Sequence, residues 1–200
     1  MAAAIPLSVP TLTDGVVQLR AFSVDDAPAL AVIWTDPAIR ARNRIPEPSE
    51  DAAREWVKHA AARAGAGEAW EWAIVDATSG ELAGRRALKE IEWEQRRAVA
   101  ASWLDPRHRG KRFAARSLRL AAAHAFAHGI VRLHAECDVD NEASFRSLLA
   151  AGMRHEGTLR SYLMSPAGVP IDQHVLGMVP QDLADAPALG NVPGGVAARA

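Results

Sequence analysis

Three strand-like segments follow one another between residues 69 and 104, and this succession constrains the fold more than any other feature of the chain. The segments read AWEWAIVDA, LAGRRALKEI and RRAVAASWL, and short polar turns separate them. Strands joined by turns this short pair with their neighbours in an antiparallel sheet. The sequence therefore predicts an antiparallel meander in the middle of the chain.

Helical patterns lie on both sides of this meander, and strands begin and end the folded part. In chain order, the other predicted elements are a strand in GVVQLRAF, a helix capped by Ser23 through VDDAPALAVIW, a helix from Ser49 to about Arg63, a helix from about Gly110 to His128, a strand in VRLHAECDV, a helix from Asn141 to Ala150 ended by Gly152, and strands in MRHEGTLRSYL and PIDQHVLGMV. This order predicts an α/β (α+β) fold, in which helices cover one sheet.

The length and composition predict one domain over residues 12–183. A chain of 200 residues that is 49% hydrophobic can bury a single core. Residues 1–11 are expected to form a short extension and to be no signal peptide, since they lack a charged start and an uninterrupted apolar core. Residues 184–200 are rich in Ala, Pro and Gly and are expected to form a disordered tail.

The charge balance bears on partners. The formal net charge of -1 provides no general attraction to nucleic acid or to an anionic membrane. No stretch approaches the roughly 20 apolar residues of a membrane span. The single cysteine, Cys137, fits the reducing cytoplasm, which is the predicted location.

The stretch RHRGKRFAARSL, residues 107–118, follows the last strand of the meander and opens a helix. The free N–H groups and positive dipole end of such a helix form an anion site, and Gly110 permits close approach of a ligand. Alone, this pattern is equally compatible with a solvated basic helix start, and less so with a nucleic-acid patch. It lacks the glycines and the Ser or Thr of a nucleotide-hydrolysing loop.

A second motif favours the anion site. In DVDNEASFRSLLAAGMRHEGTLR, Asn141 stands at a helix N-cap and Ser144 one turn further. Together the two motifs resemble the acetyl-CoA site of the GNAT N-acetyltransferase family, in its RimJ/RimL-type branch. The family's Q/R-x-x-G-x-G/A loop is matched by Arg107 and Gly110, with Arg112 where Gly or Ala is usual. The resemblance runs from about Gly15 to Leu183.

The resemblance implies a largely antiparallel central sheet of about seven strands flanked by about four helices. It implies that the strand ending at Leu104 separates from the strand in HAECDV, with the pantetheine arm of acetyl-CoA in the gap. The pyrophosphate would lie on the loop and first helical turn, and Asn141 would orient the pantetheine. The residues expected to bind acetyl-CoA are Leu104, Arg107, Arg109, Gly110, Lys111, Arg112, Phe113, Ala114, Asn141 and Ser144.

The catalytic groups are less constrained. The thioester would lie near residues 99–102, where a backbone N–H can stabilise the oxyanion. The resemblance makes Ser144 a candidate to protonate the departing thiolate, and Tyr162 competes because a phenol is a stronger acid than a serine hydroxyl. Many family members carry Glu where this chain has Val99, so the usual general base is missing. The nearest replacements by sequence are Glu90, Glu92 and Glu94, which would share one strand face.

A site without a strong base should favour an amine of low pKa. An α-amine has a pKa near 7.7, whereas deprotonating a Lys amine costs about 3.7 kcal/mol more. The predicted activity is therefore acetyl transfer from acetyl-CoA to a primary amine, either a protein or peptide N-terminus or a small-molecule amine. The alternative is a module that binds acyl-CoA without turnover. No metal is expected, because His134 and Cys137 should point to opposite strand faces, and the oligomeric state stays open, a homodimer included.

Overall fold

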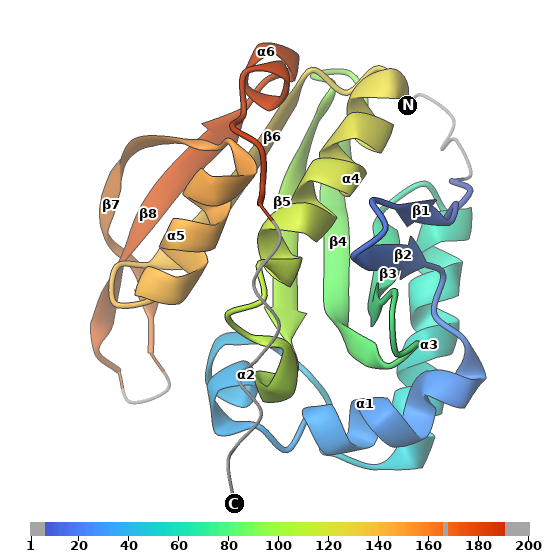
Figure 1. Ribbon diagram of the computed structural model, residues 1–200. Coiled ribbons are helices and arrows are strands. Elements are labelled where there is room, and N and C mark those ends of the chain that lie inside the picture. Colours follow the sequence, from blue (N-terminus) through green and yellow to red (C-terminus); the bar gives the residue numbers. More distant parts are fainter. Residues whose placement is uncertain (1–6, 166–167, 191–200) are drawn as a thin grey trace, which may run out of the picture.

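The computed structural model describes residues 7–165 and 168–190. Over these residues it shows an eight-stranded sheet in the order β1-β2-β3-β4-β5-β6-β8-β7, flanked by helices (Figure 1). The strands are β1 (Leu12–Thr13), β2 (Val17–Arg20), β3 (Trp70–Asp76), β4 (Leu82–Glu92), β5 (Arg97–Leu104), β6 (Arg132–Asp138), β7 (Arg154–Met164) and β8 (Pro170–Met178). The predicted α/β fold is confirmed, with the two-residue β1 in addition to the seven expected strands.

The predicted meander is β3, β4 and β5, each antiparallel to the next. The α-helices are α1 (Ala27–Ile33), α2 (Pro37–Arg42), α3 (Glu50–Gly65), α4 (Phe113–Ala127), α5 (Glu142–Ala151) and α6 (Pro180–Ala184). Short 3-10 turns, Val24–Asp26 and Pro106–His108, precede α1 and α4. No helix among the described residues has the length and apolar character needed to cross a membrane.

The helix starts follow the capping residues of the sequence. Ser23, Ser49 and Asn141 each accept a hydrogen bond from a backbone N–H in the first turn that follows. Gly152 ends α5 with φ +108°, a left-handed conformation that glycine adopts without a steric penalty. Two short helices, α2 and α6, were not expected.

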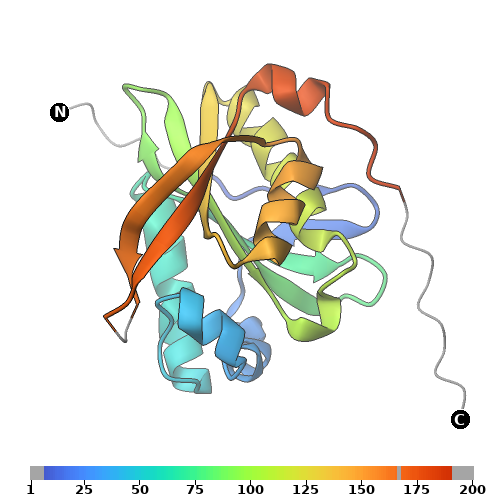
Figure 2. The ribbon, with the colours of Figure 1, turned by 90° about the vertical axis from the view of Figure 1, so that its left-hand side faces the viewer.

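The sheet buries a hydrophobic core on each face. On one face α4 and α5 cover a core that includes Trp70, Trp72, Leu118 and Leu133. On the other face α1, α2 and α3 cover a smaller core around Trp34 and Trp103. Figure 2 shows α5 and α3 on opposite sides of the sheet. On the second face, α1, α2 and α3 pack their buried residues against β3, β4 and β5. On the first face, α5 packs near β6.

Two predicted boundaries differ from the structure. The helix expected from Gly110 begins instead at Phe113, because Gly110 (φ +77°) and Arg112 (φ +62°) both have left-handed backbones that a helix excludes. Part of the tail expected to be disordered from residue 184 contacts the folded domain. Arg119 donates to the Pro187 carbonyl and Arg116 to that of Leu189, so the chain lies along α4 as far as Gly190 (Figure 1). The rest of the expected tail and residues 1–6 of the expected extension lie outside the described residues.

Candidate functional site

Strands β5 and β6 are the one parallel pair among the described strands, and they separate part of the way along. Their pairs are Arg97 with Arg132, Ala98 with Leu133 and Val99 with His134. Beyond Val99 and His134 the strands continue to Leu104 and Asp138 without pairing to each other. The edge of each strand that faces the gap therefore offers free backbone hydrogen-bonding groups to an extended ligand. This is the separation that the family resemblance implied.

The N-terminus of α4 follows the free end of β5 directly. A 3-10 turn over Pro106–His108 and the left-handed residues Gly110 and Arg112 lead the chain into the helix. The first helical hydrogen bond runs from the Arg116 N–H to the Arg112 carbonyl, so the N–H groups before it have no helical acceptor. A Cβ built on Gly110 would meet no atom within 4 Å, which leaves the loop open to a ligand. The arrangement fits a diphosphate.

The basic side chains of this loop are largely engaged elsewhere. Arg107 pairs with Asp105 at 2.7 Å, and Arg109 pairs with Asp36 at 2.8 Å. Burial alone would raise the pKa of Asp105, but the Arg107 guanidinium and backbone N–H hold it below its usual value. The Lys111 ammonium lies 6.0 Å from the centre of the Phe113 ring and forms no ion pair with the described residues. The backbone of the loop therefore offers more to an anion than its arginines do.

Arg112 turns away from the loop. Its Nη1 lies 3.5 Å from the carbonyl oxygen of Gly190, in the segment that follows α6. The backbone of Arg112 is left-handed, a conformation that glycine adopts without a steric penalty, which fits the small residue that the resemblance led us to expect here.

A buried arginine that the sequence analysis missed lies beneath the start of α4. Arg86 of β4 is 1% exposed, and its Nη2 donates to the Ala114 carbonyl at 2.7 Å and to the Ser117 hydroxyl at 3.1 Å. No carboxylate among the described residues pairs with it. Burial, and to a lesser extent Arg85, lowers the pKa of Arg86 to about 9, so the guanidinium remains charged at neutral pH. In the sequence, the only sign that Arg86 is buried is its position inside a strand pattern.

Asn141 and Ser144 stand together where predicted, at the start of α5 and next to the end of β6. The Asn141 Oδ1 accepts from the Ser144 N–H at 3.3 Å, which leaves the Asn141 amide NH₂ for another acceptor. The Ser144 hydroxyl contacts the Cys137 thiol; burial raises the pKa of that thiol, and the contact with Ser144 partly offsets the increase. Cys137 is 5% exposed and packs in the core under α4 and α5.

The predicted catalytic candidates Tyr162 and Glu92 lie on separate hairpins. Tyr162 is half exposed on β7, at the sheet edge beyond β8. Glu92 ends β4 and pairs with Arg97 at 2.8 Å. The expected shared face of Glu90, Glu92 and Glu94 is wrong, because Glu90 has φ +52° at a register shift and Glu94 lies in the turn after β4.

The exposed face of β6 carries polar side chains that point away from α4 and α5. They are Arg132, His134, Glu136 and Asp138, and they alternate with the buried Leu133, Ala135 and Cys137. Val99, paired with His134, shares their face. Asp138 accepts from Gln173 and from Arg42 of α2, whose Nε lies 3.2 Å away. The end of α2 therefore borders the open end of the gap.

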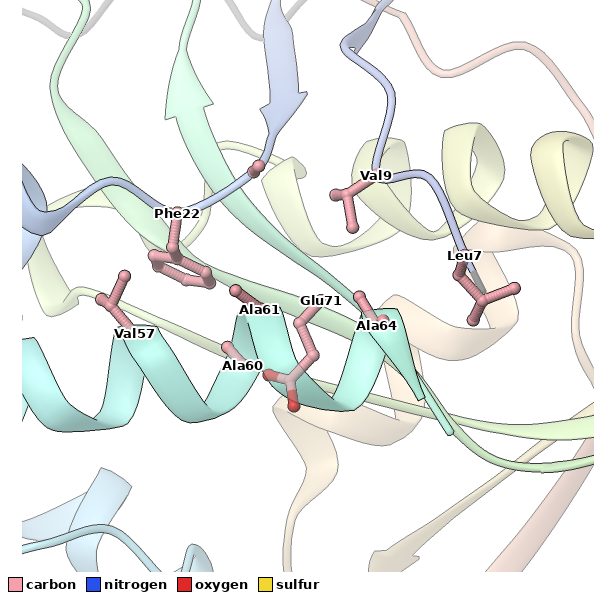
Figure 3. A pocket seen from close by; sticks show the side chains of 10 residues that line it. Leu7, Val9, Phe22, Val57, Ala60, Ala61, Ala64 and Glu71 are labelled. Carbon is pink, nitrogen blue, oxygen red and sulfur yellow. The ribbon is translucent and has the colours of Figure 1, made fainter. Parts of the chain in front are cut away.

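A pocket of 270 Å³ lies elsewhere, between α3, the N-terminal segment and β3. Figure 3 shows its apolar lining, which includes Leu7, Val9 and Phe22, and the carboxylate of Glu71 directed towards α3. Arg63 and Arg85 satisfy this carboxylate at Nε distances of 2.8 and 2.7 Å. None of the pocket's residues comes from α4 or β6, so it is separate from the gap.

No group of three or more His, Cys, Asp or Glu suited to a metal occurs among the described residues. His134 and Cys137 lie on opposite faces of β6, as predicted.

Comparisons with known proteins agree with this geometry. The model of the acetyltransferase (GNAT) domain family matches residues 17–154. The uncharacterized N-acetyltransferase YoaA of Bacillus subtilis is 34% identical over 109 residues, which are 54% of this chain and 61% of that protein. The chain thus spans less than two thirds of this relative.

Two solved structures share the fold. RimJ of Mycobacterium smegmatis, in complex with CoA-disulfide, has a TM-score of 0.76 at 22% identity, and the match covers 93% of each chain. RimL, a ribosomal L7/L12 alpha-N-protein acetyltransferase, has a TM-score of 0.73 at 22% identity, and the match covers 88% of this chain and 99% of that one.

Proposed function

The chain belongs to the GNAT acetyltransferase family, and we propose that it transfers the acetyl group of acetyl-CoA to a primary amine. The observation that carries this proposal is the separation of β5 from β6 beyond Val99 and His134, directly beside the open N-terminus of α4. A diphosphate fits the free N–H groups of that helix start, and an extended pantetheine fits the gap. Acetyl-CoA supplies the activated acyl group.

We propose the following roles for residues of the chain in binding and catalysis. The N–H groups of residues 110–115 bind the diphosphate, and the buried Arg86 adds positive charge beneath them. The free amide group of Asn141 orients the pantetheine, and the backbone of residues 99–102 presents an N–H to the thioester oxygen. We propose Ser144, beside the end of β6, as the proton donor to the departing thiolate in preference to Tyr162, which is on the edge strand β7.

An α-amine is the acceptor that we propose. Val99 provides no carboxylate, and an α-amine with a pKa near 7.7 is easier to deprotonate than a Lys amine. RimL, which shares the fold, is described as an alpha-N-protein acetyltransferase. We propose a cytoplasmic location for the chain, which its single cysteine, Cys137, fits.

The test is release of free thiol from acetyl-CoA with three acceptors. The first is a lysine-free peptide with a free N-terminus, the second is an N-acetylated peptide with one lysine, and the third is the polyamine spermidine. We expect the fastest release with the first. Thiol release with none of them, together with CoA binding by calorimetry, would favour a module that binds acyl-CoA without turnover, the alternative that Val99 supports.

We also propose a homodimer that forms through the β7–β8 hairpin. The edge strand β7 exposes the large apolar side chains Leu159, Tyr162, Leu163 and Met164, and Val169 is exposed just before β8. An edge strand pairs readily with another chain. Sedimentation of the wild type and of Leu163→Lys tests it. We expect a dimer that the lysine dissociates, and a monomeric wild type would exclude it.

A further inference from the structure

The missing carboxylate on β5 has a counterpart on the neighbouring strand, at Glu136 of β6. Val99 is paired with His134, and Glu136 lies two residues further along β6 on the same face. Two residues beyond Val99 on β5 stands Ala101, whose methyl side chain has no polar group to offer Glu136. Glu136 therefore stands where the two strands have just separated.

The exposure of Glu136 contrasts with that of its neighbours. The side chain is exposed, whereas Ala135 and Cys137 are buried in the core under α4 and α5. Glu136 thus points away from α4 and α5, to the opposite face of the sheet. On the proposed function, the acceptor approaches the thioester from this face. On this side α2 borders the open end of the gap through its Arg42 contact with Asp138.

Glu136 is also free to accept a proton. Among the described residues no hydrogen bond or ion pair to its carboxylate occurs, whereas the other carboxylate of β6, Asp138, is held by Arg42 and Gln173. Glu156 of β7, on the same side, is held by Arg132 at 2.8 Å. Of these three carboxylates, Glu136 alone keeps its lone pairs for a ligand.

We propose that Glu136 is the general base of the acetyl transfer, in place of the carboxylate that β5 lacks. The inference rests on the proposed function. As the amine nitrogen attacks the thioester carbon, the new C–N bond forms and the C–S bond breaks, and its electron pair leaves with the CoA sulfur. The nitrogen gives a proton to the Glu136 carboxylate, directly or through one water molecule, and the thiolate takes a proton from Ser144 or solvent. The negative charge of Glu136 also attracts a cationic acceptor.

The test measures kcat and KM for a lysine-free peptide with a free N-terminus, together with CoA affinity by calorimetry and Tm. We expect Glu136→Gln to lower kcat about 100-fold or more, since general bases contribute at least this much, and to leave CoA affinity and Tm unchanged. Glu136→Asp should retain at least a tenth of the wild-type kcat. Glu55→Gln, an exposed carboxylate on α3, is the matched control and should leave all values unchanged.

A second variant places a carboxylate back on β5. Val99→Glu in the Glu136→Gln background puts the acid on the same face of the neighbouring strand, and we expect it to recover kcat at least tenfold. The assignment would be overturned if Glu136→Asp were as slow as Glu136→Gln and the double variant regained no kcat.

Three further outcomes would overturn the base role of Glu136 while the proposed function stands. In the first, Glu136→Gln keeps its kcat within threefold of the wild type. In the second, Glu136→Gln raises KM at unchanged kcat, which would show attraction of the acceptor without proton transfer. In the third, Glu92→Gln is slow and Glu136→Gln is not, which would return the role to the β4–β5 hairpin. A wild type that acetylates no amine would instead remove the proposed function, and the base role with it.

Discussion

Val99 and His134 are the last paired residues of β5 and β6, and their side chains lie on the same face of the sheet. Beyond this pair the strands diverge, β5 towards the start of α4 and β6 towards the start of α5. Two helix N-termini therefore flank the open end of one gap. This explains why the loop around Gly110 and the cap at Asn141, about 30 residues apart in the sequence, belong to a single site.

Gly110→Val should weaken CoA binding at least tenfold. A β-branched residue is strained at φ +77°, and its side chain would fill the open space where the diphosphate is expected. Gly129→Val is the matched control, since Gly129 has φ +89°, is equally open, and lies at the other end of α4. Thermal unfolding should show a similar loss of Tm in both variants. Calorimetry with CoA should show a loss of affinity in Gly110→Val alone. Equal CoA affinity in the two variants would contradict the diphosphate site.

Arg112→Gly should raise stability and leave CoA affinity within about twofold. Glycine removes the cost of a left-handed backbone at φ +62°, about 1 kcal/mol, which in a chain of this size corresponds to about 2–4 °C in Tm. The side chain that is lost points to Gly190. Arg96→Gly, at φ +52° in the β4–β5 turn, is the control for strain relief remote from α4. A tenfold loss of CoA affinity in Arg112→Gly would show that its guanidinium binds phosphate.

The sequence predicted those parts of the fold and site that depend on local signals. The caps at Ser49 and Asn141 and the stop at Gly152 act within one turn of a helix, so the residues themselves indicate where α3 and α5 begin and α5 ends. The meander was predictable for the same reason, because its turns are short and polar. The short α2 was missed, since six residues carry too little periodicity.

The parts of the site that were missed depend on contacts between distant segments. Arg86 meets Ser117, 31 residues later, and nothing near Arg86 in the sequence shows that α4 covers it. Glu136 becomes a candidate base only through the register that pairs Val99 with His134. The trio around Glu92 was misread because a positive φ at Glu90 breaks the strand alternation, which the sequence does not reveal.

Arg86→Met should weaken CoA binding about five- to tenfold without lowering Tm. The buried guanidinium has hydrogen bonds but no carboxylate to offset the cost of burying its charge, so an apolar replacement of similar length costs little or stabilises the fold. The charge lies under the first turn of α4, where it favours a bound anion. Ser117→Ala removes a hydrogen-bond acceptor and keeps the charge, and it should retain CoA affinity. A Tm loss in Arg86→Met at unchanged affinity would show a purely structural arginine.

Glu71→Gln should lower the free energy of unfolding by about 3 kcal/mol at pH 7, because it leaves Arg63 and Arg85 without their shared carboxylate. In a chain of this size this corresponds to roughly 6–12 °C in Tm.

The effect of Glu71 depends on pH. Glu71 is 4% exposed, and burial by itself raises its pKa, but Arg85 and Arg63 outweigh burial and hold the pKa below the ordinary value of 4.5. The carboxylate therefore binds a proton more weakly in the folded chain than in the unfolded chain. Its contribution to stability is complete above pH 4.5 and is lost as the pH falls through the lowered value. Thermal unfolding of the wild type and of Glu71→Gln should show a difference in Tm that is constant from pH 7 down to about pH 4.5 and narrows between there and pH 3. Glu55→Gln, whose exposed pair with Lys58 contributes little, should match the wild type throughout, and a difference for Glu71→Gln that does not narrow in acid would contradict the role of this ion pair.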